Sequence, residues 1–123
     1  MKPDDFLSAH FKLAELMSPD SQTVPLDVLE NLRKLANRLE DVRTLLGNKP
    51  IHINSGYRTV SRNRAVGGVS SSQHLFGRAA DIVVTGMTPA QVYKALDKEW
   101  DGGLGGYSTF THLDIWTRRR WKG

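Results

Sequence analysis

Apolar residues recur every three or four positions between Pro25 and Leu46, and this spacing predicts one long amphipathic helix. Pro25 suits the first turn of the helix, and Gly47 suits its end. The apolar stripe consists of Val28, Leu29, Leu32, Leu35, Ala36, Leu39, Val42 and Leu46. A stripe of this kind is typical of a helix that packs against a hydrophobic core.

Three later segments have the composition of strands. Residues 51–58, IHINSGYR, predict a short strand that runs into a loop, and residues 79–84, AADIVV, predict a compact strand. Residues 108–117, STFTHLDIWT, predict a third strand whose alternate side chains point to opposite faces. One face carries Leu113 and Ile115, and the other carries Phe110, His112, Asp114 and Trp116. We expect the first face to join the core and the second to line a cleft.

The connecting segments complete the predicted fold. Residues 59–73 are rich in Gly, Ser and Arg without periodicity, so they predict a long functional loop. A capping box at Thr88 begins a helix from Pro89 to about Lys98. Residues 101–107, DGGLGGY, predict a hairpin turn, because a strand rather than a helix follows. We therefore expect an α+β fold, with helices packed on a small, mostly antiparallel sheet.

Composition narrows the domain organisation and the chemistry. A chain of 123 residues with 39% apolar residues suits one domain over residues 1–123. The absence of cysteine excludes disulfides and thiolate ligands, so any metal must be held by His, Asp or Glu. The net charge of +4 favours an acidic partner such as nucleic acid, a cell surface or an acidic peptide polymer. The N-terminal segment predicts neither a secretory signal nor a membrane span, so we expect synthesis in the cytoplasm.

Two histidines with nearby aspartates are candidates for a metal site. The stretch SQHLFGRAAD contains His74 and Asp81, and the stretch FTHLDIW contains His112. Two imidazole nitrogens and one carboxylate oxygen, with water in a fourth position, describe a catalytic zinc site. From spacing alone, a structural hydrogen-bonding role for the histidines stays open.

Four ordered motifs make the sequence resemble a known family. INSGYRT, NRAVGG, SQHLFGRAADI and GGLGGYSTFTHLDI with RRRW are similar, over most of the chain, to the zinc D-alanyl-D-alanine carboxypeptidases, peptidase family M15, subfamily A. The resemblance implies the fold shared by these peptidases and the Hedgehog signalling domain. It also implies one zinc ion per chain, held by residues matching His74, Asp81 and His112, and cleavage of peptide bonds involving D-amino acids in bacterial cell-wall peptides.

The sequence departs from the wider family where a catalytic base is expected. Other branches place Glu or Asp three residues before the last ligand, or His two before it, and here these positions hold Thr109 and Phe110. The remaining carboxylate beside His112 is Asp114, which is the candidate general base. The alternative is that Asp114 only orients a histidine ligand.

The resemblance also indicates candidate substrate contacts. Arg58 is similar to a family arginine near the substrate, where it could neutralise a carboxylate or an oxyanion, and its alternative role is to anchor the loop. Ser72 matches the serine of the family's Ser-x-His motif. Tyr107 and Trp116 are further candidates for contact with the substrate.

These observations favour a zinc peptidase acting on peptidoglycan stem peptides, as a D-Ala-D-Ala carboxypeptidase or a murein endopeptidase. Without a signal segment the enzyme would reach the wall after lysis, which suits a phage endolysin. The alternative is a catalytically inert, zinc-stabilised binding module, supported by the absent carboxylate before His112. Nucleic-acid binding ranks last because no stacking platform or docking motif is present, and RRRWKG predicts a solvated strand end with Trp121 packed on the sheet. We expect a monomer with peptidoglycan as its partner.

Overall fold

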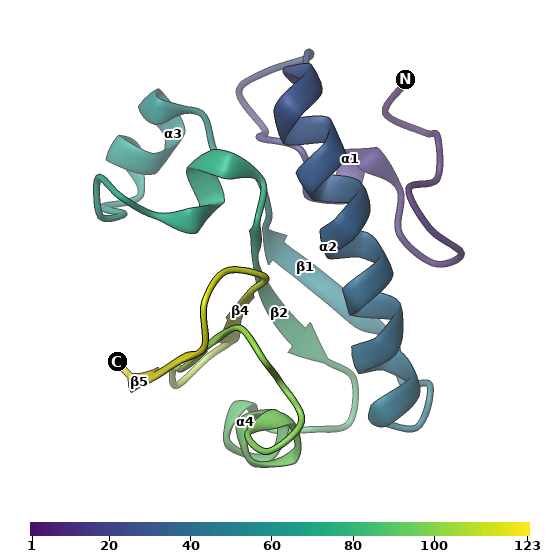
Figure 1. Ribbon diagram of the computed structural model, residues 1–123, viewed down its shortest axis with the longest axis vertical. Coiled ribbons are helices and arrows are strands. Elements are labelled where there is room, and N and C mark those ends of the chain that lie inside the picture. The colour runs from purple at the N-terminus through teal and green to yellow at the C-terminus, as the bar shows by residue number, and fades with distance from the viewer.

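The computed structural model describes residues 1–123 and has a five-stranded sheet at its centre (Figure 1). The order of the strands across the sheet is β1-β2-β4-β3-β5. Their bounds are Ile51–Ser55 for β1, Ala79–Val84 for β2, Gly103–Gly106 for β3, Thr111–Asp114 for β4 and Arg119–Lys122 for β5. Neighbouring strands are antiparallel except for β3 and β5, which are parallel. The predicted α+β fold with a small, mostly antiparallel sheet is confirmed.

The helices surround this sheet, with α3 and α2 on opposite sides of the molecule in Figure 1. Their bounds are Leu13–Leu16 for α1, Leu26–Leu45 for α2, Val60–Ala65 for α3, Gln73–Phe76 for the 3₁₀ helix η1 and Pro89–Leu96 for α4. No helix is both long enough and apolar enough to span a lipid bilayer.

Helix α2 confirms the predicted amphipathic helix, and its apolar side supplies much of the core. Pro25 lies at the N-cap position, one residue before the first turn in which it was predicted, and Gly47 follows the end of the helix with a φ of +79°. Leu32, Leu35 and Leu39 are fully buried in a cluster of 22 residues that also includes side chains of α4 and the strands. Helix α4 begins with the predicted capping box, in which the Thr88 side chain accepts from the backbone N–H of Gln91.

The register of the sheet separates two rows of side chains. Asp81, His112, Gly105 and Trp121 lie opposite one another across β2, β4, β3 and β5. The next row consists of Ala80, Leu113, Leu104 and Arg120. Because alternate residues of a strand point to opposite faces, polar groups gather on one face while Ala80, Leu104 and Leu113 join the core on the other.

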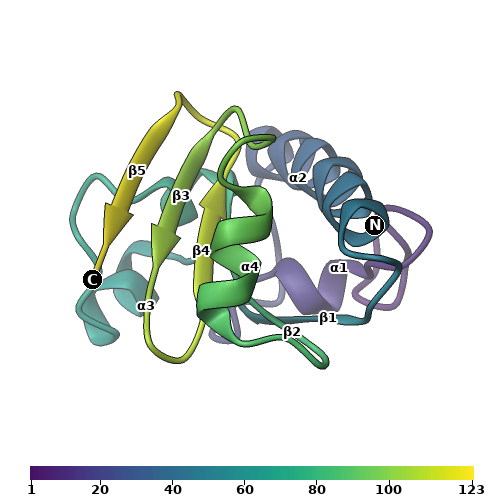
Figure 2. The ribbon, with the colours of Figure 1, turned by 90° about the horizontal axis from the view of Figure 1, so that it is seen from below.

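The glycine-rich segment is a strand rather than the predicted hairpin turn. Gly103 to Gly106 form β3, which pairs with both β4 and β5 and lies between them in Figure 2. Glycine normally weakens strands, which is why the composition favours a turn. Here a Cβ on Gly103 would collide with the Asp114 carboxylate, and one on Gly105 would lie 2.5 Å from the Trp121 ring. The glycines therefore make room for larger side chains from the neighbouring strands.

Two other predicted boundaries are corrected. Residues 59–73 are not one loop, because they contain α3 and the start of η1. Helix α3 is capped by the Thr59 side chain but buries only Asn63, so it leaves no apolar periodicity in the sequence. The third predicted strand is shorter than expected, because β4 ends at Asp114 and Trp116 lies beyond it.

Candidate metal centre and its pocket

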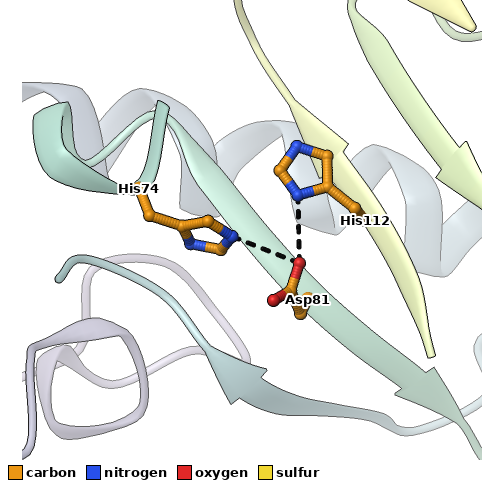
Figure 3. A group of neighbouring side chains, drawn as sticks. All are labelled: His74, Asp81 and His112. Atoms are coloured by element: carbon orange, nitrogen blue, oxygen red, sulfur yellow. Dashed lines mark hydrogen bonds and ion pairs between the residues drawn. The ribbon is translucent and has the colours of Figure 1, made fainter. Parts of the chain in front are cut away.

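Three side chains from three elements converge on one point of the polar sheet face (Figure 3). His74 comes from η1, Asp81 from β2 and His112 from β4. His74 Nε2 lies 3.2 Å from Asp81 Oδ1, and His112 Nδ1 lies 3.0 Å from the same oxygen. The structure therefore brings together the three residues predicted as metal ligands.

The other nitrogen of each ring is held by a hydrogen-bond acceptor. His74 Nδ1 lies 2.7 Å from the backbone carbonyl of Gly56, so it must carry hydrogen and donate. His112 Nε2 lies 2.9 Å from Asp114 Oδ2 and donates in the same way. The nitrogens that face Asp81, His74 Nε2 and His112 Nδ1, then have free lone pairs. They can lie favourably beside the carboxylate only if each ring takes up a second proton there or if a cation lies between the three groups.

The three donors fit a zinc ion in chemistry and spacing. Zinc takes imidazole nitrogen and carboxylate oxygen at about 2.0–2.1 Å, so two ligand atoms of a tetrahedral site lie roughly 3.4 Å apart. The observed separations of 3.0 and 3.2 Å are close to that value. His74 and Asp81 are buried, and the His112 side chain is only 12% exposed. The ligand atoms thus have nearly the spacing that a tetrahedral zinc ion requires.

Arg58 holds the second oxygen of Asp81. Its Nη2 lies 3.1 Å from Asp81 Oδ2, while its Nε donates to Ser55 Oγ at 3.0 Å and its Nη1 to Asn63 Oδ1 at 3.2 Å. Burial disfavours the ionised form of Asp81, but its bonds with His112 and His74 outweigh this cost and hold the pKa of the carboxyl below its usual range. Arg58 therefore supports a metal ligand and is itself tied down at three nitrogens.

Asp114 is fully buried behind His112. Its Oδ1 accepts from the backbone N–H groups of Gly103 and Trp116, each at 3.1 Å, and from Arg119 Nη2 at 2.6 Å. Burial raises the pKa of this carboxyl, but its bonds with His112 and Arg119 outweigh burial and lower it. Burial likewise opposes the charged form of His112, yet its bonds with Asp114 and Asp81 raise the pKa of its ring. With both oxygens engaged, Asp114 is better placed to orient His112 than to take a proton from a substrate.

A pocket of about 530 Å³ opens over the three candidate ligands. This volume is in the usual range for a small-ligand site. Ser72 and Tyr107, both predicted as substrate contacts, line it. Ser72 Oγ also accepts from the backbone N–H of His74 at 3.2 Å, so it caps η1. Tyr107 stacks on Phe110 with ring centroids 4.5 Å apart, and its hydroxyl accepts from Trp121 Nε1 at 2.9 Å.

Trp116 lies outside this pocket. The prediction placed it beside His112 on one strand face, but the strand ends two residues before it. Its side chain is 48% exposed, and the Arg78 guanidinium lies 4.3 Å from its ring centroid and 5.0 Å from that of Phe76. A substrate-binding role for Trp116 stays a prediction.

The sequence predicted a solvated strand end with Trp121 packed on the sheet, and in the structure both Arg119 and Trp121 line the pocket. Both lie on β5, where they pair with Gly103 and Gly105 of β3. Arg120 points the other way and binds the carbonyls of Trp100 and Gly102. The sequence signal for this arrangement is the pair of glycines two residues apart, matched by two large side chains two residues apart.

Comparison with known proteins gives a consistent assignment. The family model for Peptidase M15 matches residues 9–114. A segment of 45 residues is 47% identical to the zinc D-Ala-D-Ala carboxypeptidase of Streptomyces albus G, covering 37% of this chain and 18% of that protein. The chain is 30% identical over 136 aligned positions to the probable peptidoglycan L,D-endopeptidase MepK of Haemophilus influenzae, covering 95% of this chain and 73% of that protein. It is 34% identical over 95 residues to the peptidoglycan L,D-endopeptidase MepK of Escherichia coli K12, covering 71% and 52%.

Proposed function

Because this chain belongs to the peptidase M15 family, as its motifs predicted, we propose that it is a zinc-dependent peptidase that hydrolyses peptide bonds of peptidoglycan. The observation that carries the proposal is the convergence of His74, Asp81 and His112 at the floor of a pocket, with both rings held in the orientation a metal requires. The names of the relatives, a zinc D-Ala-D-Ala carboxypeptidase and peptidoglycan L,D-endopeptidases, support the metal and the substrate class.

Each of these side chains has a distinct task in this proposal. His74 Nε2, Asp81 Oδ1 and His112 Nδ1 would hold the ion, while Arg58 fixes the carboxylate ligand and Asp114 fixes the His112 ring. A zinc ion held by three protein ligands makes water more acidic and polarises a carbonyl group. The aromatic wall formed by Tyr107 and Trp121 would position the peptide and exclude part of the solvent.

The relatives are named for cleavage of different peptide bonds. The carboxypeptidase aligns over 37% of this chain, whereas the L,D-endopeptidases align over 71% and 95%. We therefore rank cleavage of an L,D bond within the peptide first, and removal of a terminal D-alanine second. The complete ligand set and the open pocket favour either over the inert binding module. Endolysin action, a monomeric state and the place of synthesis stay predictions from the sequence.

Digestion of purified sacculi by zinc-loaded protein, with the products identified by mass spectrometry, tests the proposal. We expect zinc-dependent release of new peptide termini. Loss of a single D-alanine would indicate a carboxypeptidase, and cleavage at an L,D bond would indicate an endopeptidase. The variant His74→Ala, which lacks one ligand, should release nothing. A zinc-loaded parent protein that cleaves neither sacculi nor isolated stem peptides would refute the proposed function.

A further inference from the structure

We infer that Arg119, on β5, forms a carboxylate-binding subsite of the pocket that Ser72 also lines. The inference rests on the proposed function, since the carboxylate would belong to the peptide substrate. It assigns to the last strand a role that the sequence motif had suggested for Arg58.

Arg58 has little donor capacity left for a substrate. Its Nε, Nη1 and Nη2 are engaged by Ser55, Asn63 and Asp81, and its side chain is 13% exposed. A substrate carboxylate bound there would compete with Asp81, and so would loosen a metal ligand. The geometry of Arg58 is that of an internal support.

Arg119 has the free donors that Arg58 lacks. Its Nη2 donates to Asp114 at 2.6 Å and its Nε to the carbonyl of Thr117 at 3.2 Å, while its Nη1 has no hydrogen-bond partner in the protein and is not buried. The side chain is 39% exposed and lines the pocket. The guanidinium lies 5.5 Å from the centroid of the Trp121 ring. One edge of the group is therefore fixed by Asp114 and Thr117, and Nη1 remains open to a ligand.

The charge of the pocket favours an anion at this position. The carboxylates that line the pocket are Asp81 and Asp114, and each is already paired with an arginine. Two arginines thus balance two aspartates, so a bound zinc ion leaves an excess of positive charge in a partly enclosed site. A carboxylate would receive a charge-assisted hydrogen bond from Nη1. It could be the C-terminal carboxylate of a stem peptide or a carboxylate on one of its internal residues.

Peptides that differ only in which carboxylate is amidated distinguish the C-terminal from the internal carboxylate as the group that Arg119 binds. Hydrolysis would be measured at saturating zinc on a stem peptide, on its C-terminal carboxamide and on its form with the internal carboxylate amidated. We expect amidation of the recognised carboxylate to lower kcat/KM of the parent protein by about 10 to 100-fold. In Arg119→Gln this preference should vanish, and Arg119→Lys should retain part of it. Arg64→Gln, which removes an exposed arginine outside the pocket, is the matched control and should keep the full preference.

The same measurements distinguish the subsite from a structural role. If Arg119 acted only through Asp114, Arg119→Gln would slow all three peptides equally and leave the preference intact, which would overturn the inference. Binding of the acid and carboxamide peptides to the zinc-loaded protein, measured by calorimetry, gives a readout that does not depend on turnover. An acid preference that is lost in Arg119→Gln would support the subsite even if nothing were hydrolysed, although the proposed function would then have failed. Equal binding of all peptides by the parent would overturn the subsite alone.

Discussion

The carboxylate of Asp114 determines which nitrogen of His112 carries hydrogen. It accepts from Nε2 at 2.9 Å, so the neutral ring keeps its lone pair on Nδ1, the nitrogen beside Asp81. A backbone carbonyl, that of Gly56, does the same for His74. In both rings, the nitrogen that faces Asp81 is therefore the one whose lone pair is free for a metal.

Replacing Asp114 with asparagine should weaken zinc binding by about 10 to 100-fold. The donors from Gly103, Trp116 and Arg119 would hold the amide oxygen in the Oδ1 position, so the amide NH₂ would face His112. That NH₂ group cannot accept from Nε2–H, and it would favour hydrogen on Nδ1, where the metal should bind. Competition with a chelator measures the affinity.

Excess zinc should restore most of the hydrolysis rate of Asp114→Asn. The general-base alternative predicts the reverse, namely normal zinc affinity and a rate lower by roughly 10² to 10⁴ at saturating metal. Asp4→Asn, the same chemical change at an exposed aspartate, should alter neither quantity.

At the residue scale, the sequence predicted the side chains that occur in short motifs. The family motifs predicted His74, Asp81 and His112 as one ligand set, whereas their spacing alone left a structural role open, and the structure brings the three together. Arg119 was not predicted as a pocket residue, because three consecutive arginines do not by themselves indicate which of them faces the pocket. The parallel pairing of β5 with β3 places Arg119 at the pocket and Arg120 on the opposite face of the sheet.

At the scale of elements, β3 shows that packing against neighbouring strands can outweigh the low strand propensity of glycine. Helix α2 could be predicted from its stripe, and α4 from its capping box, because both signals are local. The strand character of residues 103–106 could not, because the reason for its glycines lies in Asp114 and Trp121, which follow later in the chain. Glycine there is a consequence of packing rather than a signal of a turn.

The substitution Gly105→Ala should destabilise the protein by about 1–3 kcal/mol, because overpacking costs this much in a tight site. The added Cβ would lie 2.5 Å from the Trp121 ring and would displace it from the pocket wall. Denaturant unfolding followed by tryptophan fluorescence measures the loss.

The same Gly105→Ala substitution made in a Trp121→Ala protein tests whether the Trp121 ring causes the loss of stability. In Trp121→Ala, which lacks the ring, Gly105→Ala should cost much less, and the difference between the two backgrounds is the coupling energy. An equal cost in both backgrounds would show that the clash with Trp121 is not responsible.

At the scale of the whole molecule, the core and the candidate metal centre are separate. The 22-residue cluster contains none of the three candidate ligands, and it joins helices α2 and α4 to the sheet. We therefore expect the protein to fold without metal, with zinc adding stability by mass action.

Removal of zinc should lower the melting temperature without unfolding the protein at 25 °C. At a free zinc concentration 100 times Kd, binding adds about 2.7 kcal/mol, which corresponds to a shift on the order of 10 °C for a domain of this size. Calorimetry with and without chelator measures the shift. The melting temperature of His74→Ala should not change when the chelator is added. If the melting temperature of the parent protein did not change either, this would contradict zinc binding in this pocket.

Strand β5 also affects whether two copies of the protein can pair through their sheet edges. Strand β5 forms one edge of the sheet, is four residues long and carries Arg119, Arg120 and Lys122. An exposed edge strand offers unpaired backbone groups to any other chain and is a common route to aggregation. Two β5 edges brought together would place cations opposite cations, which opposes strand pairing. The strand that contributes Arg119 and Trp121 to the pocket therefore also opposes the pairing of two β5 edges.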